Sequence, residues 1–77
     1  MMLSAMNSIT RVASSVIAEV RYDDERNLLE VHFHNGRVYR YLDVPPDEHE
    51  ALIHADSVGR YFNQEIRTRY KVLKKRE

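Results

Sequence analysis

The residues of this chain best suited to chemistry are basic and aromatic side chains that could bind a polyanion. Residues 57–77 carry seven basic and two acidic side chains, whereas residues 23–56 carry three basic and nine acidic ones. A basic segment can mark a surface for nucleic acid, and tyrosines on an open sheet can stack on unpaired bases. The candidate nucleic-acid contacts are Tyr39, Arg40, Tyr41, Arg60, Arg67, Arg69 and Lys71, followed by Lys74, Lys75 and Arg76 near the end of the chain.

The same charges allow a second interpretation. The basic residues could form the solvated face of a helix that runs into a frayed terminus. The chain carries twelve basic and twelve acidic side chains, and this zero net charge argues against strong binding to a polyanion. Both interpretations stay open at this stage.

A second candidate site is the segment Ser57-Val58-Gly59-Arg60 at the predicted start of a helix. The free N–H groups of a helix start can hold a phosphate, so Ser57 and Gly59 are candidate phosphate contacts. The alternative is structural, because serine is a common helix N-cap and glycine allows close approach of a neighbouring element.

The remaining polar residues give no catalytic or metal signature. His32 and His34 share one side of a strand, but two ligands do not make a metal site. His49 and His54 would point about 140° apart on a helix at ~100° per residue. Ser14-Ser15 has no glycine elbow around it, and the chain has no glycine-rich phosphate loop. We therefore predict a non-catalytic protein without metal or cofactor.

Size and composition limit the chain to one small domain. A chain of 77 residues buries only about 60–65% of its unfolded surface, which leaves little room for an enclosed cavity. There is no cysteine, which excludes disulfides and suits a reducing compartment. No apolar run approaches the ~20 residues needed to span a bilayer. A cytoplasmic location is the resulting expectation.

Three segments show the two-residue period of β-strands, at residues 16–22, 29–33 and 37–44. One side of the first segment carries Val16, Ala18, Val20 and Tyr22, and the other carries Ile17, Glu19 and Arg21. Short polar connections link the three segments, so the strands should form an antiparallel meander.

Two short helices are predicted to follow. Pro45-Pro46 ends strand pairing and suits a helix start, and the first helix should end near Ala55. Ser57 is the expected N-cap of the second helix, whose apolar stripe is Val58, Phe62, Ile66 and Tyr70. The predicted fold is α+β, a three-stranded antiparallel meander followed by two short helices packed on one face. Residues 1–11 are expected to be a flexible N-terminus, 12–72 the domain and 73–77 a basic disordered tail.

The turn at Asn35-Gly36 decides which way the tyrosines point. A two-residue turn would pair Phe33 with Val38 and place Tyr39 and Tyr41 on the open face. A three-residue loop with a bulge at Gly36 would pair Val31 with Tyr39 and place both tyrosines on the core face. The second register separates polar from apolar side chains better, and we favour it, although a one-residue slip reverses every orientation.

With these elements assigned, the chain resembles the KTSC domain family, named after the C-terminus of some lysyl-tRNA synthetases and also found as stand-alone bacterial proteins. The resemblance covers about residues 12–70. It rests on Val12 and Ser14-Ser15, Tyr22-Asp23, Leu29-x-Val31-x-Phe33, Asn35-Gly36, Tyr39-x-Tyr41, Asp43-Val44-Pro45, Ala55-x-Ser57-x-Gly59, Tyr61-Phe62-Asn63 and Ile66-Arg67.

The resemblance implies no established activity, and attachment to a synthetase suggests RNA binding. It points to five positions with a role beyond packing: Tyr39, Tyr41, Ser57, Asn63 and Arg67. His49 stands where the family pattern leads us to expect an aromatic residue, which predicts an altered helix-to-sheet contact.

The function predicted from the sequence is that of a small binding module for RNA or single-stranded nucleic acid, acting through its basic C-terminal helix. The alternative is a protein-interaction or self-associating structural module that uses the open sheet face or a sheet edge.

Overall fold

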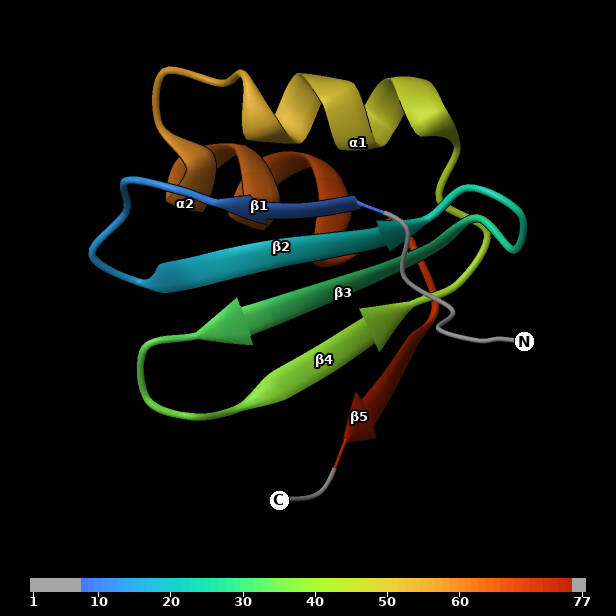
Figure 1. The fold of residues 1–77 in the computed structure, drawn as a ribbon, viewed down its shortest axis with the longest axis horizontal. Helices are drawn as coiled ribbons and strands as arrows, with labels where there is room; N and C mark the ends of the chain where they lie inside the picture. The colour runs from blue at the N-terminus through green and yellow to red at the C-terminus, as the bar shows by residue number, and fades with distance from the viewer. Residues whose placement is uncertain (1–7, 76–77) are drawn as a thin grey trace.

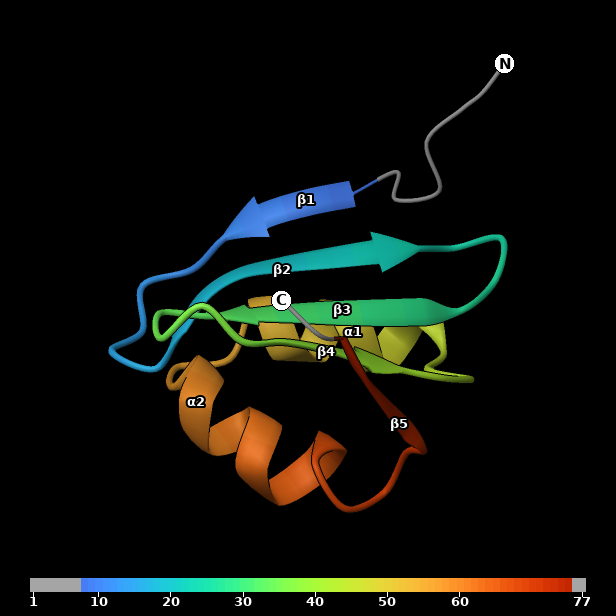
Figure 2. The same ribbon diagram turned by 90° about the horizontal axis from the view of Figure 1, so that it is seen from below.

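Five antiparallel strands form one sheet in the order of the sequence, and the helical segments cover one of its faces (Figure 1 and Figure 2). The structure is a computed structural model that describes residues 8–75. The strands are β1 (Ser8–Arg11), β2 (Ile17–Asp23), β3 (Leu28–Phe33), β4 (Val38–Tyr41) and β5 (Val72–Lys75). Between β4 and β5 lie α1 (Pro46–Ile53), α2 (Val58–Tyr61) and the π-helical turn η1 (Phe62–Ile66).

The predicted α+β class and the antiparallel sheet are confirmed, but the number of strands was wrong. Strand β1 pairs with β2 and strand β5 pairs with β4, so both edges of the sheet come from segments in which no strand was expected. Each added strand has only four residues, too short to show a two-residue period by itself. The rest of the expected flexible N-terminus (1–7) and of the basic tail (76–77, with Arg76) lies outside the described residues.

The β3–β4 hairpin takes the register with a three-residue loop. Phe33 N–H donates to the Arg37 carbonyl at 2.9 Å, and Gly36 has the positive φ of +91° that this loop requires. Val31 therefore stands opposite Tyr39, and Leu29 opposite Tyr41. Both tyrosines lie on the face covered by the helices, as the favoured register predicted.

Strand β2 departs from its two-residue period at a β-bulge. Ile17 pairs with Phe33 while Glu19 pairs with His32, so β2 advances by two residues where β3 advances by one. As a result Ile17 is fully buried on the same face as Val20, and Val16 is 51% exposed. The alternation expected from the sequence placed Val16 on the same side as Val20 and Ile17 on the opposite side. It was wrong for these two residues, which precede or open the bulge.

Ser14 supports this bulge from the β1–β2 connection. Its hydroxyl oxygen accepts hydrogen bonds from the N–H groups of Val16 and Ile17, each at 3.1 Å. Its carbonyl contacts the His34 ring nitrogen at 2.9 Å. Ser14 thus has a structural role at the entrance to β2.

The second helical segment combines α2 with η1. Ser57 is its N-cap, since its hydroxyl oxygen accepts from Arg60 N–H at 3.3 Å, as predicted. The Arg67 N–H donates to the Phe62 carbonyl at 2.9 Å, which is an i→i+5 bond. A stripe that repeats every four residues would drift around a helix of 3.6 residues per turn, and the wider π turn reduces that drift. Val58, Phe62 and Ile66 are all buried.

Glu48 links the two helical segments. Its carboxylate accepts hydrogen bonds from the hydroxyls of Tyr61 and Tyr70, the latter at 2.9 Å. The hydrogen bond to Glu48 is the main reason why the pKa of Tyr61 rises to about 12. One carboxylate on α1 therefore anchors two points of the segment that follows.

Replacing this carboxylate should weaken the fold. We expect Glu48→Gln to lower the free energy of unfolding by about 1 kcal/mol, because an amide keeps only one acceptor oxygen for two hydroxyl donors. Urea denaturation followed by circular dichroism measures the change. Glu50→Gln is the matched control on the same helix, since Glu50 is exposed and should change stability by less than about 0.5 kcal/mol. Equal effects of the two substitutions would contradict the anchoring role.

Candidate functional site

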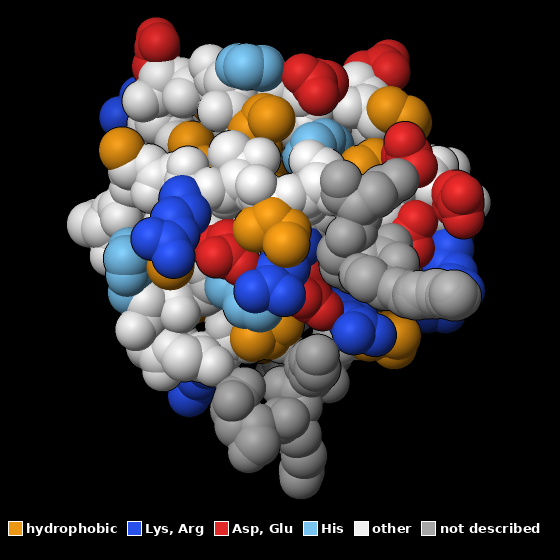
Figure 3. Space-filling view, viewed as in Figure 1, with side chains coloured by type: hydrophobic (Ala, Val, Ile, Leu, Met, Phe, Trp, Pro, Cys, Tyr) orange, Lys and Arg blue, Asp and Glu red, His pale blue; other side chains and the backbone are white. Residues whose placement is uncertain are grey.

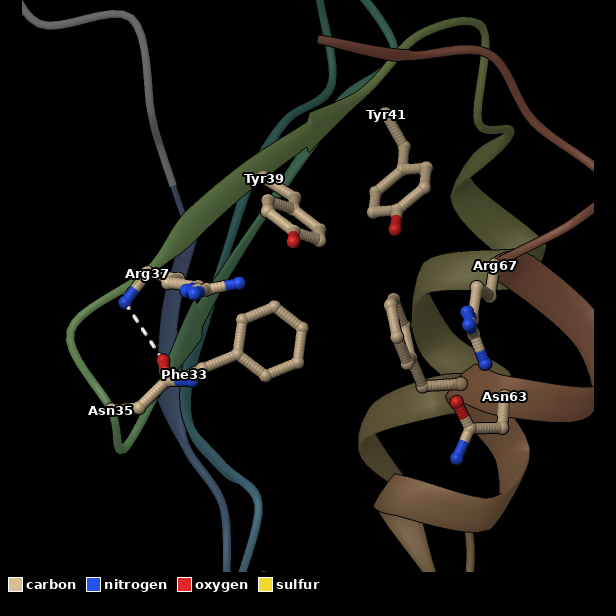
Figure 4. Close-up of a pocket in the computed structure, with 8 residues that line it drawn as sticks. Phe33, Asn35, Arg37, Tyr39, Tyr41, Asn63 and Arg67 are labelled. Atoms are coloured by element: carbon tan, nitrogen blue, oxygen red, sulfur yellow. Dashed lines mark hydrogen bonds between the residues drawn. The ribbon is translucent and has the colours of Figure 1, made fainter. Parts of the chain in front are cut away.

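A hollow of about 240 Å³ opens between the β3–β4 hairpin and the α2–η1 segment (Figure 4). We call it the aromatic pocket. It is lined by Phe33, Asn35, Arg37, Tyr39, Tyr41, Phe62, Asn63 and Arg67. The first five residues come from the hairpin and the last three from η1 and the residue after it. Two segments distant in the sequence therefore build one site.

The wall of the aromatic pocket consists of rings packed edge to face. Phe33 lies 5.3 Å from Tyr39 and 5.6 Å from Phe62, measured between ring centroids. Tyr41 lies 5.6 Å from Phe62. These contacts fix the rings against one another, because such geometry is favoured between aromatic side chains. The result is a rigid apolar surface that can receive a flat ligand.

Tyr41 is the most buried residue of the pocket, with 1% of its surface exposed. Its hydroxyl points into the hollow (Figure 4) and forms no hydrogen bond with any of the residues 8–75. Burial, and next the neighbouring Tyr39, raise the pKa of Tyr41 to about 12. The hydroxyl therefore stays protonated at neutral pH and can donate a hydrogen bond.

Polar side chains surround the opening of the aromatic pocket. Arg37 lies on the hairpin side and Arg67 on the helix side (Figure 4), and neither forms an ion pair within the described part of the chain. The Asn35 side-chain oxygen accepts from Arg37 N–H at 3.0 Å, which orients that amide. Asn63 adds a second amide from η1. The opening can therefore offer two unpaired cations to an anionic ligand.

The structure distributes the predicted nucleic-acid contacts over several surfaces. Tyr39, Tyr41 and Arg67 meet in the aromatic pocket. Arg40 lies on the opposite sheet face, where its Nε donates to Glu30 at 2.7 Å. Arg69 pairs with Glu65 at 2.8 Å, and Lys71 is exposed beside β5.

The outer sheet face carries an ionic network instead of an open aromatic surface. Basic and acidic side chains alternate across it (Figure 3). Glu30 lies at its centre with 3% exposure, bound by Arg40 and by His32, each at 2.7 Å. Burial alone would favour the neutral acid, but the hydrogen bonds from Arg40 and His32 prevail and lower the pKa of Glu30. We interpret this network as a support for the central strands.

A second hollow of about 360 Å³ lies next to the aromatic pocket and shares Asn63 with it. It is lined mainly by small and polar residues, among them Ser14, Ser57, Gly59 and Arg60. A Cβ atom added at Gly59 would lie 3.5 Å from the Ser14 hydroxyl, an ordinary contact. The sequence-based candidates Ser57 and Gly59 thus lie together with Ser14, while their role as phosphate contacts stays a prediction.

The histidines do not gather around a common point. His32 contacts Glu30 on the outer face, His34 contacts the Ser14 carbonyl, and His49 stacks on Tyr22 with 4.4 Å between ring centroids. Within residues 8–75 no three histidine or carboxylate side chains stand close enough to hold a metal ion. His49 itself supplies the aromatic contact from helix to sheet for which the family pattern predicts another residue.

Five residues of the aromatic pocket were absent from the sequence-based candidates for nucleic-acid contact: Phe33, Asn35, Arg37, Phe62 and Asn63, the last of which only the family resemblance singled out. Phe33 and Phe62 were assigned to the apolar core, Asn35 to the hairpin turn and Arg37 to the start of the third strand. A usable signal was the favoured hairpin register, because it places Phe33, Arg37, Tyr39 and Tyr41 on one face.

None of the helices among residues 8–75 has the length and apolar character that crossing a bilayer requires.

The fold and the pocket define a small α+β module with one aromatic site between sheet and helix. The KTSC domain model matches residues 13–70, and the chain belongs to the KTSC domain family. A crystal structure of a KTSC domain protein from Yersinia pestis is similar, with a TM-score of 0.82 and 33% identity over 90% of this chain and 97% of that one.

Relatives are similar in sequence as well. A protein of Stutzerimonas stutzeri is 51% identical over 51 residues, which is 66% of this chain and 72% of that protein. A protein of Tsukamurella paurometabola is 34% identical over 80% of this chain and 92% of its own length. A lysine–tRNA ligase of Trichormus variabilis is 39% identical over 57 residues, which is 74% of this chain but 10% of the ligase.

Proposed function

We propose that this module binds single-stranded RNA and holds one unpaired base in the aromatic pocket. The observation that supports this most is the meeting of four aromatic rings with two arginines that have no carboxylate partner among the described residues. Unpaired bases bind proteins by stacking on aromatic side chains, while basic side chains contact the phosphates.

The dimensions of the pocket favour a single base. Sites for drug-sized ligands usually measure 300–1,000 Å³, and this pocket of about 240 Å³ is smaller. A double helix keeps its bases stacked and would present none to the pocket. The proposal therefore requires a preference for single strands over duplexes.

The relatives lend independent support. One of them is a lysine–tRNA ligase, in which the matched region is about a tenth of the protein. A ligase with this name acts on a transfer RNA, so an added RNA-binding module would be of use to it. For the present chain, RNA as the partner remains part of the proposal.

Charge limits the affinity that we expect. The chain has zero formal net charge, and α1 carries Asp47, Glu48 and Glu50. If Arg37 and Arg67 supply two phosphate contacts, a tenfold rise in salt concentration should weaken binding about 25-fold, from a slope of about 0.7 per contact for single strands. Stacking in the pocket would supply the part of the affinity that salt does not remove.

The test is fluorescence anisotropy with a labelled single-stranded RNA of about eight nucleotides and mixed sequence. Tyr39→Ala should weaken binding about tenfold or more, because base–aromatic stacking contributes about 1–3 kcal/mol. Arg67→Gln should weaken binding and reduce its salt dependence. Arg26→Ala is the matched control, since Arg26 is an exposed cation in the turn between β2 and β3 and should leave binding unchanged.

Circular dichroism of each variant checks that the fold is retained. Equal loss of binding in Arg26→Ala and Arg67→Gln would indicate nonspecific attraction and contradict the pocket. An absence of binding to any single-stranded RNA at low salt would overturn the proposed function.

Self-association through the sheet has less support. The apolar side chains most exposed on the edge strands are Ile9 on β1, at 58%, and Leu73 on β5, at 52%. They lie at opposite edges of the sheet, with the Glu30 network between them. A contiguous apolar patch is the usual mark of a docking face, and these two residues do not form one.

A further inference from the structure

We propose that the aromatic pocket selects a base that carries a carbonyl group in place of an exocyclic amine, and thus uracil over cytosine. The selecting groups are the Tyr41 hydroxyl, which points into the pocket, and the Arg67 guanidinium on the helix side of its opening. This inference rests on the proposed function, because it names the base that the same pocket receives.

The Tyr41 ring is buried, but its hydroxyl opens onto the hollow. A hydroxyl in this position can donate a hydrogen bond to a ligand, whereas a phenylalanine ring would offer no polar atom there. Tyr41 is buried to 99%, yet its hydroxyl points into the hollow and has no partner among residues 8–75. The geometry therefore suits a ligand atom that accepts a hydrogen bond there.

The Arg67 guanidinium is a second hydrogen-bond donor of the pocket. A guanidinium has five N–H donors and no acceptor, so Arg67 can only donate. It has no carboxylate partner within the described part of the chain, and its positive charge acts on Tyr41. Because the pKa of Tyr41 is raised to about 12, its hydroxyl keeps the proton that it would donate. Both groups thus favour a ligand edge with acceptors.

Stacking and base selection depend on different residues of the aromatic pocket. Every base has an aromatic face, so Phe33, Tyr39 and Phe62 would receive all four bases with little preference. Asn63 also selects weakly, since an amide can donate or accept. Only the edge of the base that faces Tyr41 and Arg67 can be discriminated. With position 4 of a pyrimidine against these two groups, the uracil O4 atom can accept from both, whereas the N4 amine of cytosine is a donor that would face two donors. The N3 atom, a donor in uracil and an acceptor in cytosine, then lies away from both groups.

Uridine 5′-monophosphate and cytidine 5′-monophosphate make a matched pair of probes. They share size, sugar, phosphate and charge, and they differ in the edge of the base. We expect titrations monitored by amide chemical shifts of the intact protein to give a Kd about five- to tenfold lower for the uridine nucleotide, corresponding to about one hydrogen bond. The shifted amides should include those of the aromatic pocket.

Tyr41→Phe removes a single oxygen atom and should bring the two dissociation constants within about twofold of each other. Tyr70→Phe is the matched control, because its hydroxyl binds Glu48 away from the aromatic pocket. That variant should keep the five- to tenfold difference. A five- to tenfold difference between the two dissociation constants that persists in Tyr41→Phe would overturn the role of the hydroxyl.

Two results separate this inference from the proposed function. Equal dissociation constants for both nucleotides, or tighter binding of the cytidine nucleotide, would overturn the selection while single-stranded RNA binding stands. Failure of the protein to bind either the nucleotides or single-stranded RNA would overturn both. Shifts confined to residues outside the aromatic pocket would also overturn the inference, because the base would then lie elsewhere.

Discussion

Phe62→Ala should lower the free energy of unfolding by about 3–5 kcal/mol, the usual range for truncating a buried phenylalanine. Phe62 is 4% exposed and contacts the rings of both Phe33 and Tyr41 edge to face. Its removal would leave a cavity where the sheet meets the α2–η1 segment. Because small domains are stable by only about 5–15 kcal/mol, the variant should lose most of its stability.

Guanidinium chloride denaturation followed by circular dichroism measures this loss. Phe62→Leu should retain part of the packing and fall between the parent protein and Phe62→Ala. Ile9→Ala is the control for loss of an apolar side chain at the surface and should change stability by less than about 0.5 kcal/mol, because Ile9 is exposed. A loss below about 1 kcal/mol in Phe62→Ala would mean that the helical segment contributes little to the core.

His49→Phe should stabilise the protein, and more so in mild acid than at neutral pH. His49 is 4% exposed, its ring is nearly parallel to that of Tyr22 (6° between planes), and its Nε2 is buried without a hydrogen bond among the described residues. Phenylalanine would keep the stacked ring and remove the unsatisfied nitrogen. The expected gain at neutral pH is about 1 kcal/mol.

The acid part of this prediction follows from linkage. Burial lowers the pKa of His49 in the fold, although Glu50, at 3.9 Å, opposes the shift. An unfolded histidine has a pKa of about 6.5, so below that pH the unfolded chain gains a proton that the folded chain does not. The stability of the parent protein therefore falls as pH decreases from about 7.5 to about 5. His49→Phe has no histidine at this position and so lacks this pH dependence. Its advantage over the parent in free energy of unfolding should therefore be larger at about pH 5 than at neutral pH, by at most about 2 kcal/mol.

Denaturation midpoints at several pH values between about 7.5 and 5 measure the effect, and this window stays above the range where most carboxylates titrate. His54→Gln, at the C-cap of the same helix, is the control, because His54 is exposed and makes the smallest of the three contributions to the shifted pKa of His49. The control should keep the pH dependence of the parent protein. A parallel pH dependence in His49→Phe and the parent would contradict a buried neutral histidine.

Local signals in the sequence predicted a large part of this molecule. Asn35-Gly36 between alternating segments indicated the hairpin, and separation of polar from apolar side chains favoured the register that the structure has. Ser57 was recognised as a helix cap because capping depends on groups three residues apart. Each of these features is decided by residues close together in the chain.

Longer-range features could not be predicted in this way. The β-bulge at the start of β2 depends on pairing with β3 and on the hydroxyl of Ser14, and a period of two gives no sign of it. The edge strands β1 and β5 form because β2 and β4 offer them unpaired backbone groups, although each has only four residues.

The amino-acid sequence by itself determined the α+β class, the central hairpin, the inward tyrosines and the two helix starts, since each follows from periodicity, turn chemistry or capping. The tertiary structure decided the five-stranded sheet and the aromatic pocket. The pocket exists because the α2–η1 segment crosses the sheet beside the hairpin, which places Asn63 and Arg67 across the hollow from Phe33 and Tyr39. That crossing is set by the packing of Phe62 and Ile66 against distant strands, which no local pattern in the chain encodes.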